Sequence, residues 1–278
     1  RNLLKDDPKY SLDGIGAYHL TLGRNKKSVE LDLKSEEGLK LFKELVAVAD
    51  VVVDNFSQGV TKRLGIDHQS LKKVNPKIIT CSISGFGDTE VNRPAYDNLI
   101  QGYAGAMSIT GTDKENPVKS GIPIADLGAG LYAVIGILSA IQSREKSDSG
   151  EHVDISMLDT QVSLLTYMAT MHFLSGENPE PIGNQHMNHV PFNSYRTSDG
   201  FIQIGVVAED FWPSLIEALD LRQLNTEENK VRSGRLKNRP HIDQAVQEVF
   251  FTNSTEHWLK ILQEHRVPCG PINTLSET

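Results

Sequence analysis

The fold is decided by residues 29–56, which read VELDLKSEEGLKLFKELVAVADVVVDNF. Val29, Leu31 and Leu33 alternate with polar residues, and this spacing of two predicts a strand. We expect that strand to end near Lys34, where a serine and two glutamates are typical of a helix start. Apolar residues then recur at three- and four-residue steps, and a run of three valines predicts a second, buried strand. A strand, a helix and a strand in this order predict a parallel sheet with a helical crossover.

The same alternation of strands and helices continues as far as residue 174. The further elements that we expect are helices ending at Gly65 and over 67–74, 98–109, 127–142 and 158–174, and strands over 77–83 and 152–156. A polar stretch with two prolines, 175–181, predicts a linker. Beyond it, a strand over 201–207 is followed by helical periodicity up to residue 267. We therefore expect an α/β fold, with a Rossmann-like parallel sheet in a large domain and a second, smaller α+β domain.

Composition and residue spacing argue against several classes of function. The formal net charge is −8, whereas binding to nucleic acid requires a basic face. We expect no membrane partner, because the most apolar segment, 131–141, is too short to span a bilayer. The two cysteines lie far apart, which favours a reducing compartment such as the cytoplasm. His186 and His189 have a spacing that could serve a metal but no evident third ligand, so we expect no metal site.

Asp126 is the acidic residue whose sequence context most clearly indicates a catalytic role. It follows the apolar and small residues of 121–125 and opens a strongly apolar helix. The simpler interpretation is a helix cap, because aspartate is a favoured N-cap residue. The functional interpretation rests on Gly128 and Gly130, which are poor helix formers and would leave room for a bulky ligand. A helix start also favours an ionised carboxylate, which can act as a nucleophile.

Other polar positions are less specific. Tyr96 and Asp97 stand just before a predicted helix, where Asp97 alone would be interpreted as a cap. The segments 54–56 and 84–87 directly follow predicted strands, which is where parallel sheets bind ligands. Cations such as Arg63 are individually ordinary surface residues, although a phosphate-bearing ligand needs only a few of them.

Several motifs in sequence order resemble the class III CoA-transferases, also called the CaiB/BaiF family. The motifs that carry the resemblance are RNKKSVELDLK at 24–34, ADVVVDNF at 49–56, SISGFG at 82–87, RPAYD at 93–97, ADLGAG at 125–130 and VPCGPIN at 267–273. The resemblance covers nearly the whole chain. Ordered matches at family-like spacing are more specific than any one motif.

The resemblance implies roles for individual residues. Asp126 matches the family's nucleophile, and Tyr96 and Asp97 match the residues that line the thioester site. The positions that match CoA-binding residues are Leu31, Lys34, Asn55, Phe56, Arg63 and Met157. A glycine loop that covers the intermediate in formate- or oxalate-handling members matches the active-site loop of Gly183, Asn184 and Gln185. Only one glycine is kept here, which disfavours a formyl-CoA transferase and suggests a larger acid.

The resemblance also implies a domain plan and a partner. We expect a large CoA-binding catalytic domain over 1–176, a linker and active-site loop over 177–190, a small α+β domain over 191–268 and the start of a return linker over 269–278. In the family, further segments precede and follow this stretch and two chains interlock, so we expect an interlocked homodimer. Coenzyme A enters as a substrate, and no permanently bound cofactor is expected. The expected compartment is the cytoplasm, or mitochondria or peroxisomes in a eukaryote.

The implied reaction moves CoA from an acyl-CoA donor to a carboxylic acid through a covalent intermediate on Asp126. Succinyl-CoA is the favoured donor, and the sequence does not name the acceptor. One alternative is a 2-methylacyl-CoA racemase on the same fold, which has a histidine where this chain has Tyr96. A phenol is a poor base at neutral pH, and this disfavours the racemase. A second alternative is a non-catalytic CoA-binding protein in which Asp126 is only a cap.

Overall fold

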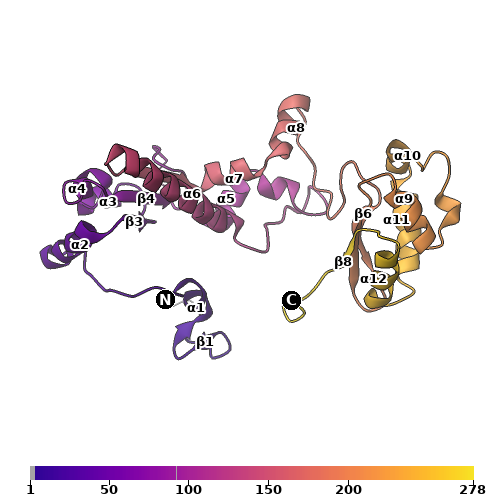
Figure 1. Ribbon diagram of the computed structural model, residues 1–278, viewed down its shortest axis with the longest axis horizontal. Coiled ribbons are helices and arrows are strands. Elements are labelled where there is room, and N and C mark those ends of the chain that lie inside the picture. Colours follow the sequence, from indigo (N-terminus) through magenta and orange to yellow (C-terminus); the bar gives the residue numbers. More distant parts are fainter. Residues whose placement is uncertain (1–3, 92) are drawn as a thin grey trace. The chain divides into compact units, whose positions relative to one another are not determined.

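The structure is a computed structural model that describes residues 4–91 and 93–278 (Figure 1). Its internal contacts divide the chain into two compact units. Unit 1 consists of Arg1–Ile83 and Ala133–Asp154, and unit 2 consists of Ser84–Tyr132 and Ile155–Thr278. Each unit therefore combines stretches that are far apart in the sequence. The division into consecutive domains that we expected from the sequence stays a prediction.

The parallel sheet is built from strands that the sequence predicted after residue 50. β3 (Val51–Asp54) runs parallel to β4 (Ile79–Ser84), with Val51 opposite Ile79. β5 (His152–Ser156) is the third strand, and the strand order is β3-β4-β5. The parallel pairing confirms the expected parallel sheet, and it places the carboxyl ends of β3 and β4 at one edge.

The strand that we predicted over 29–34 is wrong. The structure has no strand there, and the chain instead turns at Asp32, whose side chain accepts a hydrogen bond from the backbone of Lys34 at 3.0 Å. The backbone oxygen of Asp32 then accepts from Ser35, and the next helix begins. Alternating apolar and polar residues form a strand only where a neighbouring strand bonds to their backbone groups. Here the side chains of Asp32 and Ser35 bond to nearby backbone groups instead. Val29 accordingly remains 66% exposed.

Two of the next three helices begin at positions predicted from the sequence, Ser35 and Asp67. α2 (Glu36–Val48) starts after Ser35, whose hydroxyl oxygen accepts from a backbone N–H at 3.0 Å. α3 (Val60–Leu64) ends at Gly65, and α4 (His68–Lys72) follows. The buried side chains of one apolar cluster here are Val46, Ile66, Leu71 and Ile78. Before these elements, the hairpin of β1 (Ser11–Leu12) and β2 (Ile15–Gly16) leads into α1 (Ala17–Leu22).

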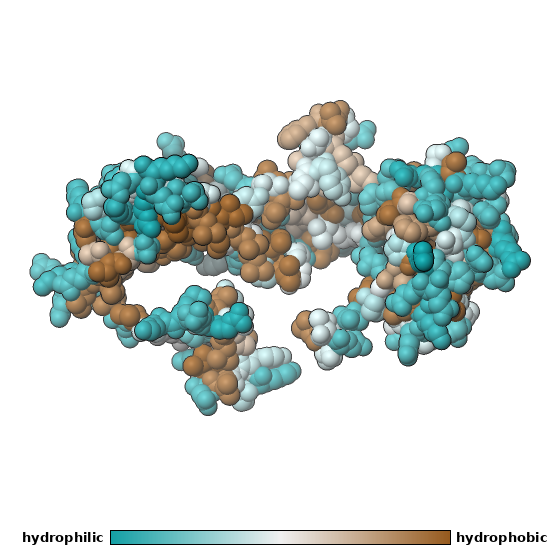
Figure 2. Space-filling view, in the orientation of Figure 1, coloured by the Kyte–Doolittle hydropathy of each residue, from teal (hydrophilic) through white to brown (hydrophobic). Residues whose placement is uncertain are grey.

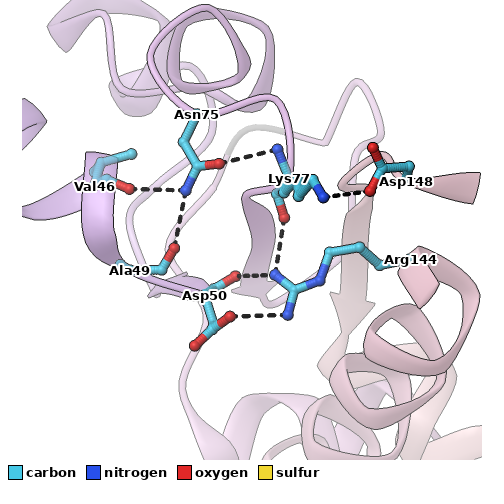
Figure 3. A network of polar contacts seen from close by, with 7 residues as sticks. All are labelled: Val46, Ala49, Asp50, Asn75, Lys77, Arg144 and Asp148. Carbon is cyan, nitrogen blue, oxygen red and sulfur yellow. Dashed lines mark hydrogen bonds and ion pairs between the residues drawn. The ribbon is translucent and has the colours of Figure 1, made fainter.

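Polar contacts connect the starts of β3 and β4 (Figure 3). The guanidinium of Arg144, near the end of α6 (Ile124–Ser147), donates to the backbone oxygens of Asp50 at 3.4 Å and Lys77 at 3.0 Å. It also donates to the Asp50 carboxylate at 2.8 Å. Asn75 donates to two carbonyls at the end of α2, at 3.0 and 3.1 Å. These contacts connect the residues just before β3 and β4 to α2, which precedes both strands in the sequence, and to α6, which follows them.

The helix α6 is longer than the segment 127–142 predicted from the sequence. Leu131, Val134, Ile135 and Leu138 are 53–67% exposed, and Figure 2 shows apolar surface along this helix. In the described part of the chain, α6 is long and apolar enough to cross a membrane, by length and composition alone. The expectation that no segment is long enough to span a bilayer rested on 131–141 alone and is wrong for the whole of α6. A helix that packs against another protein surface has the same kind of exposed apolar face.

Two helices that were predicted as continuous are divided in unit 2. α5 (Asp97–Tyr103) and the 3-10 helix η1 (Ala106–Ile109) are separated at Gly105, whose φ is +79°. α7 (Met157–Leu164) and α8 (Tyr167–Ser175) are separated at Thr166, whose φ is +50°. A right-handed helix cannot continue through a residue with positive φ, so the two breaks have the same backbone cause.

The C-terminal part of unit 2 contains an antiparallel sheet. β6 (Phe192–Arg196) pairs with β7 (Phe201–Gly205), which also pairs with β8 (Cys269–Pro271). The helices between them are α9 (Phe211–Ala218), α10 (Arg232–Lys237), α11 (Arg239–Phe250) and α12 (Thr255–Glu264), with the 3-10 helix η2 (Arg222–Leu224). Their core buries Trp212 and Phe250 completely or almost so. Sequence periodicity predicted β7 and the helices but missed β6 and β8.

Candidate active site

Asp126 lies in the first turn of α6 and is exposed. The carbonyl of Pro123 accepts the first hydrogen bond of the helix, from Leu127 at 3.0 Å, so Pro123 occupies the cap position. Asp126 is consequently the third residue of the helix and not its N-cap, which was the simpler sequence-based interpretation. Because Pro123 has no side-chain acceptor, the free N–H groups at the helix start need a partner from elsewhere.

Asp97, the first residue of α5, is that partner. Its Oδ1 accepts from the backbone N–H of Ala125 at 2.9 Å and from that of Asp126 at 3.4 Å. Asp97 therefore caps a helix other than its own. The structure thus brings together two of the three residues that were predicted to be catalytic, through a contact that the sequence did not reveal.

Gln101 binds the other oxygen of Asp97. Its Nε2 donates to Asp97 Oδ2 at 2.6 Å, and its Oε1 accepts from the backbone N–H of Ser120 at 2.9 Å. The residue is only 1% exposed. Gln101 was not among the predicted site residues, although an acid and an amide four positions apart on one helix commonly make contact.

The pKa of Asp126 is raised above the ordinary value of an aspartate. Partial desolvation is the larger cause, and repulsion by the Asp97 carboxylate is the smaller. The helix start was expected to favour the ionised form, but the N–H groups that would do so are engaged by Asp97. Once ionised, a carboxylate with a raised pKa is a stronger base and nucleophile.

Tyr96 immediately precedes α5, and its side chain makes no capping hydrogen bond. It is 69% exposed, so its hydroxyl is accessible to a ligand. The turn before it is tightly packed, because a Cβ added to Gly85 would lie 2.2 Å from the Cβ of Ala95. The guanidinium of Arg93 lies 4.8 and 4.4 Å from the centroids of two aromatic rings. These contacts fix the turn that ends at Tyr96.

The two glycines of the first α6 turns have different surroundings. A Cβ on Gly128 would lie 3.1 Å from Leu164 Cδ1 and 3.2 Å from Thr160 Cγ2, so this glycine allows α7 to approach α6. A Cβ on Gly130 would meet nothing within 4 Å. The expectation that both glycines leave room for a ligand is therefore wrong for Gly128 and stays a prediction for Gly130.

Asn55 and Phe56, two of the predicted CoA-binding residues, follow β3 at the carboxyl edge of the sheet. Asn55 Nδ2 donates to the backbone oxygen of Ile83 in β4 at 2.6 Å. Asp54 accepts from the backbone N–H of Phe56 at 3.1 Å and from the hydroxyl of Ser82 at 2.7 Å. These bonds fix the turn after β3 and leave Phe56 42% exposed.

The other predicted CoA-binding residues are distributed over both units. Leu31, Lys34 and Arg63 belong to unit 1, and Met157 belongs to unit 2. Lys34 and Arg63 are exposed, and a Cβ on Gly59 would lie 3.3 Å from an Arg63 guanidinium nitrogen. Met157 is 5% exposed. A CoA site that joins residues of the two units stays a prediction.

Hydrogen bonds anchor the predicted active-site loop in unit 2. Gly183, whose φ is +62°, donates to the backbone oxygen of Gly111 at 2.7 Å. Asn184 donates to a serine hydroxyl of β6 at 2.6 Å. Arg239 of α11 donates to the Gln185 side chain at 3.4 Å and to the next backbone oxygen at 2.6 Å. Arg239 was not predicted as a site residue, because its contact with Gln185 joins segments more than 50 residues apart.

The histidines with metal-like spacing form a ring pair beside this loop. The ring centroids of His186 and His189 are 4.5 Å apart. Desolvation, followed by the neighbouring His186, lowers the pKa of His189, whose buried Nδ1 has no hydrogen-bond partner among the described residues. In residues 4–91 and 93–278 there is no group of three or more side chains suited to a metal ion.

Comparison with known proteins identifies the family to which these residues belong. The family model described as CoA-transferase family III matches residues 4–278. The chain belongs to CoA-transferase family III. It is 32% identical over 261 residues to human succinyl-CoA:glutarate CoA-transferase, covering 93% of this chain and 60% of that protein. It is 32% identical over 286 residues to succinyl-CoA:mesaconate CoA-transferase of Haloarcula hispanica, covering 99% of this chain and 72% of that protein.

A solved structure shares the fold of this family III chain. The crystal structure of a CaiB/BaiF family protein from Brucella suis matches it with a TM-score of 0.89 at 34% identity. The match covers 98% of this chain and 74% of the Brucella chain. It confirms the resemblance inferred from the sequence and the mixed α/β fold with a parallel sheet. The family III chain spans 60% of the length of its human relative.

Proposed function

We propose that this family III protein transfers CoA from an acyl-CoA donor to a carboxylic acid, with Asp126 as the nucleophile. The observation that carries the proposal is the exposed Asp126 carboxylate, whose pKa is raised, in a helix turn whose backbone donors are engaged by Asp97. Asp126 is therefore free to attack a substrate rather than occupied as a cap. Both relatives named above are CoA-transferases, which supports the same class of reaction.

The reaction proceeds in two symmetrical halves. The Asp126 carboxylate attacks the donor thioester and expels CoA as a thiolate, leaving a mixed anhydride on Asp126. The thiolate attacks the aspartyl carbonyl of that anhydride and expels the donor acid as a carboxylate, which gives an aspartyl-CoA thioester. The acceptor carboxylate attacks this thioester and expels the thiolate again. The thiolate then attacks the acceptor carbonyl of the new anhydride, which forms the product thioester and regenerates the Asp126 carboxylate.

This sequence of steps needs no net proton transfer, so positioning and exclusion of water are the main tasks of the site. Tyr96 orients the acyl group of the thioester, and Asp97 sets the surroundings of Asp126. The loop of Gly183, Asn184 and Gln185 covers the intermediate. The unit 1 side chains that bind CoA are Leu31, Lys34, Asn55, Phe56 and Arg63, with Arg63 near its phosphates.

The proposed donor is succinyl-CoA, and the proposed acceptor is a small dicarboxylic acid. The human relative is named for succinyl-CoA and glutarate, and the archaeal relative for succinyl-CoA and mesaconate. The active-site loop keeps a single glycine at Gly183, and the side chains that follow suit an acid larger than formate. Coenzyme A takes part only as a substrate.

A second copy of this chain is the proposed partner of the apolar face of α6. Leu131, Val134, Ile135 and Leu138 are more than half exposed, and an apolar face of this kind is stable against another protein surface. An interlocked homodimer would provide that surface. A Leu138→Glu change should then raise the dissociation constant of the dimer in sedimentation experiments, whereas a monomeric wild-type protein would contradict this arrangement.

Replacement of Asp126 by Asn tests the proposed nucleophile. The neutral amide keeps the shape of the side chain but cannot form the anhydride, so CoA transfer should be lost while CoA binding and folding remain. Hydroxylamine added during turnover of the wild-type protein should convert Asp126 to a hydroxamate that is detected by peptide mass. Asp67→Asn is the control, because Asp67 only caps α4. Normal transfer by a folded Asp126→Asn protein contradicts the proposal.

The racemase alternative is tested with the same protein. A 2-methylacyl-CoA is incubated with the enzyme in deuterated water, without an acceptor acid. A transferase should leave the α-position unlabelled. Rapid incorporation of deuterium at that carbon would instead favour the racemase and would require a base other than the exposed Tyr96 hydroxyl.

A further inference from the structure

Gln101 is a buried polar residue that no step of the proposed reaction uses directly. It lies on α5 and is 1% exposed. Both ends of its amide have partners, Asp97 for the nitrogen and Ser120 for the oxygen. A buried amide is favourable only when its groups are paired, and an apolar side chain could fill the same volume without that requirement. A hydrogen-bonding role is therefore indicated for Gln101.

The contact with Gln101 determines the orientation of Asp97. One carboxylate oxygen accepts from Gln101 at 2.6 Å, and the other accepts from Ala125 at 2.9 Å. A carboxylate held at both oxygens cannot rotate without breaking one of these bonds. Asp97 is only half-buried, so without Gln101 its side chain could turn towards solvent or towards the start of its own helix.

Gln101 also fixes the chain on both sides of Pro123. Its oxygen accepts from Ser120, three residues before Pro123. Through Asp97 it holds the N–H groups of Ala125 and Asp126, two and three residues after Pro123. One side chain thereby links α5 to the segment that enters α6 and to the first turn that carries Asp126.

We propose that Gln101 is a positioning residue for the transfer reaction, which acts through Asp97 to fix the backbone and the electrostatic surroundings of Asp126. The inference rests on the proposed role of Asp126 as the nucleophile. Gln101 does not touch the substrate. Its effect is to keep a negative charge beside a carboxylate that loses its own charge when it is acylated.

The charge of Asp97 favours the acylated state of Asp126. Ionised Asp126 is repelled by Asp97, whereas Asp126 in the anhydride or the thioester is neutral and is not. Partial desolvation and, second, repulsion by Asp97 raise the pKa of Asp126, because a nearby like charge disfavours the ionised form of a carboxyl group. If Asp97 turned away, the pKa of Asp126 would fall, and ionised Asp126 would be a more stable and less reactive ground state.

The test compares Gln101→Met with Gln161→Met in the full-length enzyme. Gln161 is 4% exposed, and its side-chain oxygen has no hydrogen-bond partner among the described residues, so it is a matched buried amide outside the Asp97 contact. For Gln101→Met, kcat should fall about 10- to 100-fold with KM for the acyl-CoA nearly unchanged. The acid limb of kcat/KM should also move to lower pH. Gln161→Met should keep the wild-type kcat and acid limb.

A second variant and a double-mutant cycle separate positioning from simple packing. Gln101→Glu keeps an acceptor for Ser120 and, because burial beside Asp97 favours the protonated carboxyl, a donor to Asp97, so it should keep a higher kcat than Gln101→Met. Adding Gln101→Met to Asp97→Ala should cause little further loss, because Gln101 acts through Asp97. A kcat for Gln101→Glu no higher than that of Gln101→Met, or fully additive losses in the cycle, would overturn the inference. If Gln101→Met does not fold, Gln101→Asn is judged by the same criteria.

The trapping experiment distinguishes failure of this inference from failure of the proposed function. If wild-type Asp126 is trapped as a hydroxamate but Gln101→Met keeps the wild-type kcat and acid limb, the positioning role alone is overturned. If Asp126 is not trapped and Asp126→Asn still transfers CoA, both the proposed function and the role of Gln101 are overturned. Trapping at Asp126, together with a reduced kcat and a shifted acid limb in Gln101→Met, supports both.

Discussion

Arg144 Nη2 lies 2.8 Å from the carboxylate of Asp50, although the two residues are 94 positions apart in the sequence. The same guanidinium donates to the backbone oxygens of Asp50 and Lys77, which precede neighbouring parallel strands. The side chain of Arg144 is 18% exposed, whereas that of Asp50 is 78% exposed. Water therefore screens the charge pair, and the hydrogen bonds to the backbone oxygens contribute most of the stabilisation.

Arg144→Met should lower the free energy of unfolding by about 1–3 kcal/mol, because two backbone oxygens at the strand starts lose a charged donor. The measurement is urea unfolding of the full-length protein. Arg222→Met is the control, because Arg222 pairs with Asp220 where both side chains are more than 80% exposed, and it should cost less than about 1 kcal/mol. Equal losses for the two variants would show that Arg144 acts only as a surface charge.

Gly130→Ala should raise the free energy of unfolding by about 0.5–1 kcal/mol, since alanine is the better helix former and the added Cβ meets nothing within 4 Å. Gly128→Ala should gain less or be destabilising, because its Cβ would press on Leu164 and Thr160. Unfolding in urea compares the two. A larger gain for Gly128→Ala would contradict the close approach of α6 and α7. A Gly130→Ala protein that is more stable but has a lower kcat/KM would place Gly130 beside bound acyl-CoA.

The parts of the fold that followed from the sequence are those with local causes. The three-valine strand, the Ser35 cap and the Gly65 helix end each depend on residues that are adjacent in the sequence. The prediction of a strand over 29–34 was wrong because alternating apolar residues form a strand only beside a partner strand. Here the chain turns at Asp32, whose side chain accepts a backbone hydrogen bond instead. The short strands β6 and β8 were missed because both form by pairing with β7.

The candidate site was predictable as a set of residues but not as an arrangement. The motifs identified Asp97 and Asp126, yet the cap that Asp97 supplies to α6 depends on the folding of two separate helices against each other. The helix start was predicted near Asp126 because the residues before it are small and apolar. In the structure, Pro123 occupies the cap position, and this leaves the cap to a residue 28 positions away from Ala125.

Arg63→Ala should weaken CoA binding by about 1–3 kcal/mol, the usual scale for losing a charge-assisted hydrogen bond to a phosphate. Arg63 is exposed on α3, which follows the turn of Asn55 and Phe56 at the carboxyl edge of β3. Isothermal titration with CoA measures the change. Lys62→Ala, a neighbouring exposed cation, is the control for a general loss of charge. Unchanged affinity in Arg63→Ala, or the same loss in both variants, would mean that the phosphates bind elsewhere.

The raised pKa of Asp126 also has a consequence for stability. When the pKa of an acid is higher in the folded than in the unfolded state, the folded state binds the proton more tightly. Stability then decreases as the pH rises from the ordinary value through the raised value, and the cost is fully present above the raised value. It disappears as the pH falls below the ordinary value. Ionised Asp126 therefore destabilises the fold near neutral pH.

Asp126→Asn should accordingly be more stable than the wild-type protein at pH 7, because the neutral amide is not repelled by Asp97 and is less costly to desolvate. The difference should shrink as the pH is lowered and vanish below the ordinary pKa of an aspartate, where both proteins carry an uncharged group at this position. Urea unfolding at a series of pH values measures it. Asp67→Asn should behave in the opposite way, because the pKa of Asp67 lies below its ordinary value: desolvation raises it, but hydrogen bonds from Ser70 and from nearby backbone N–H groups together outweigh that effect. A contrary result would be an Asp126→Asn protein that is less stable than the wild type at pH 7 by an amount that does not depend on pH. The Asp126 carboxylate would then stabilise the helix start, and the raised pKa on which its proposed reactivity rests would be contradicted.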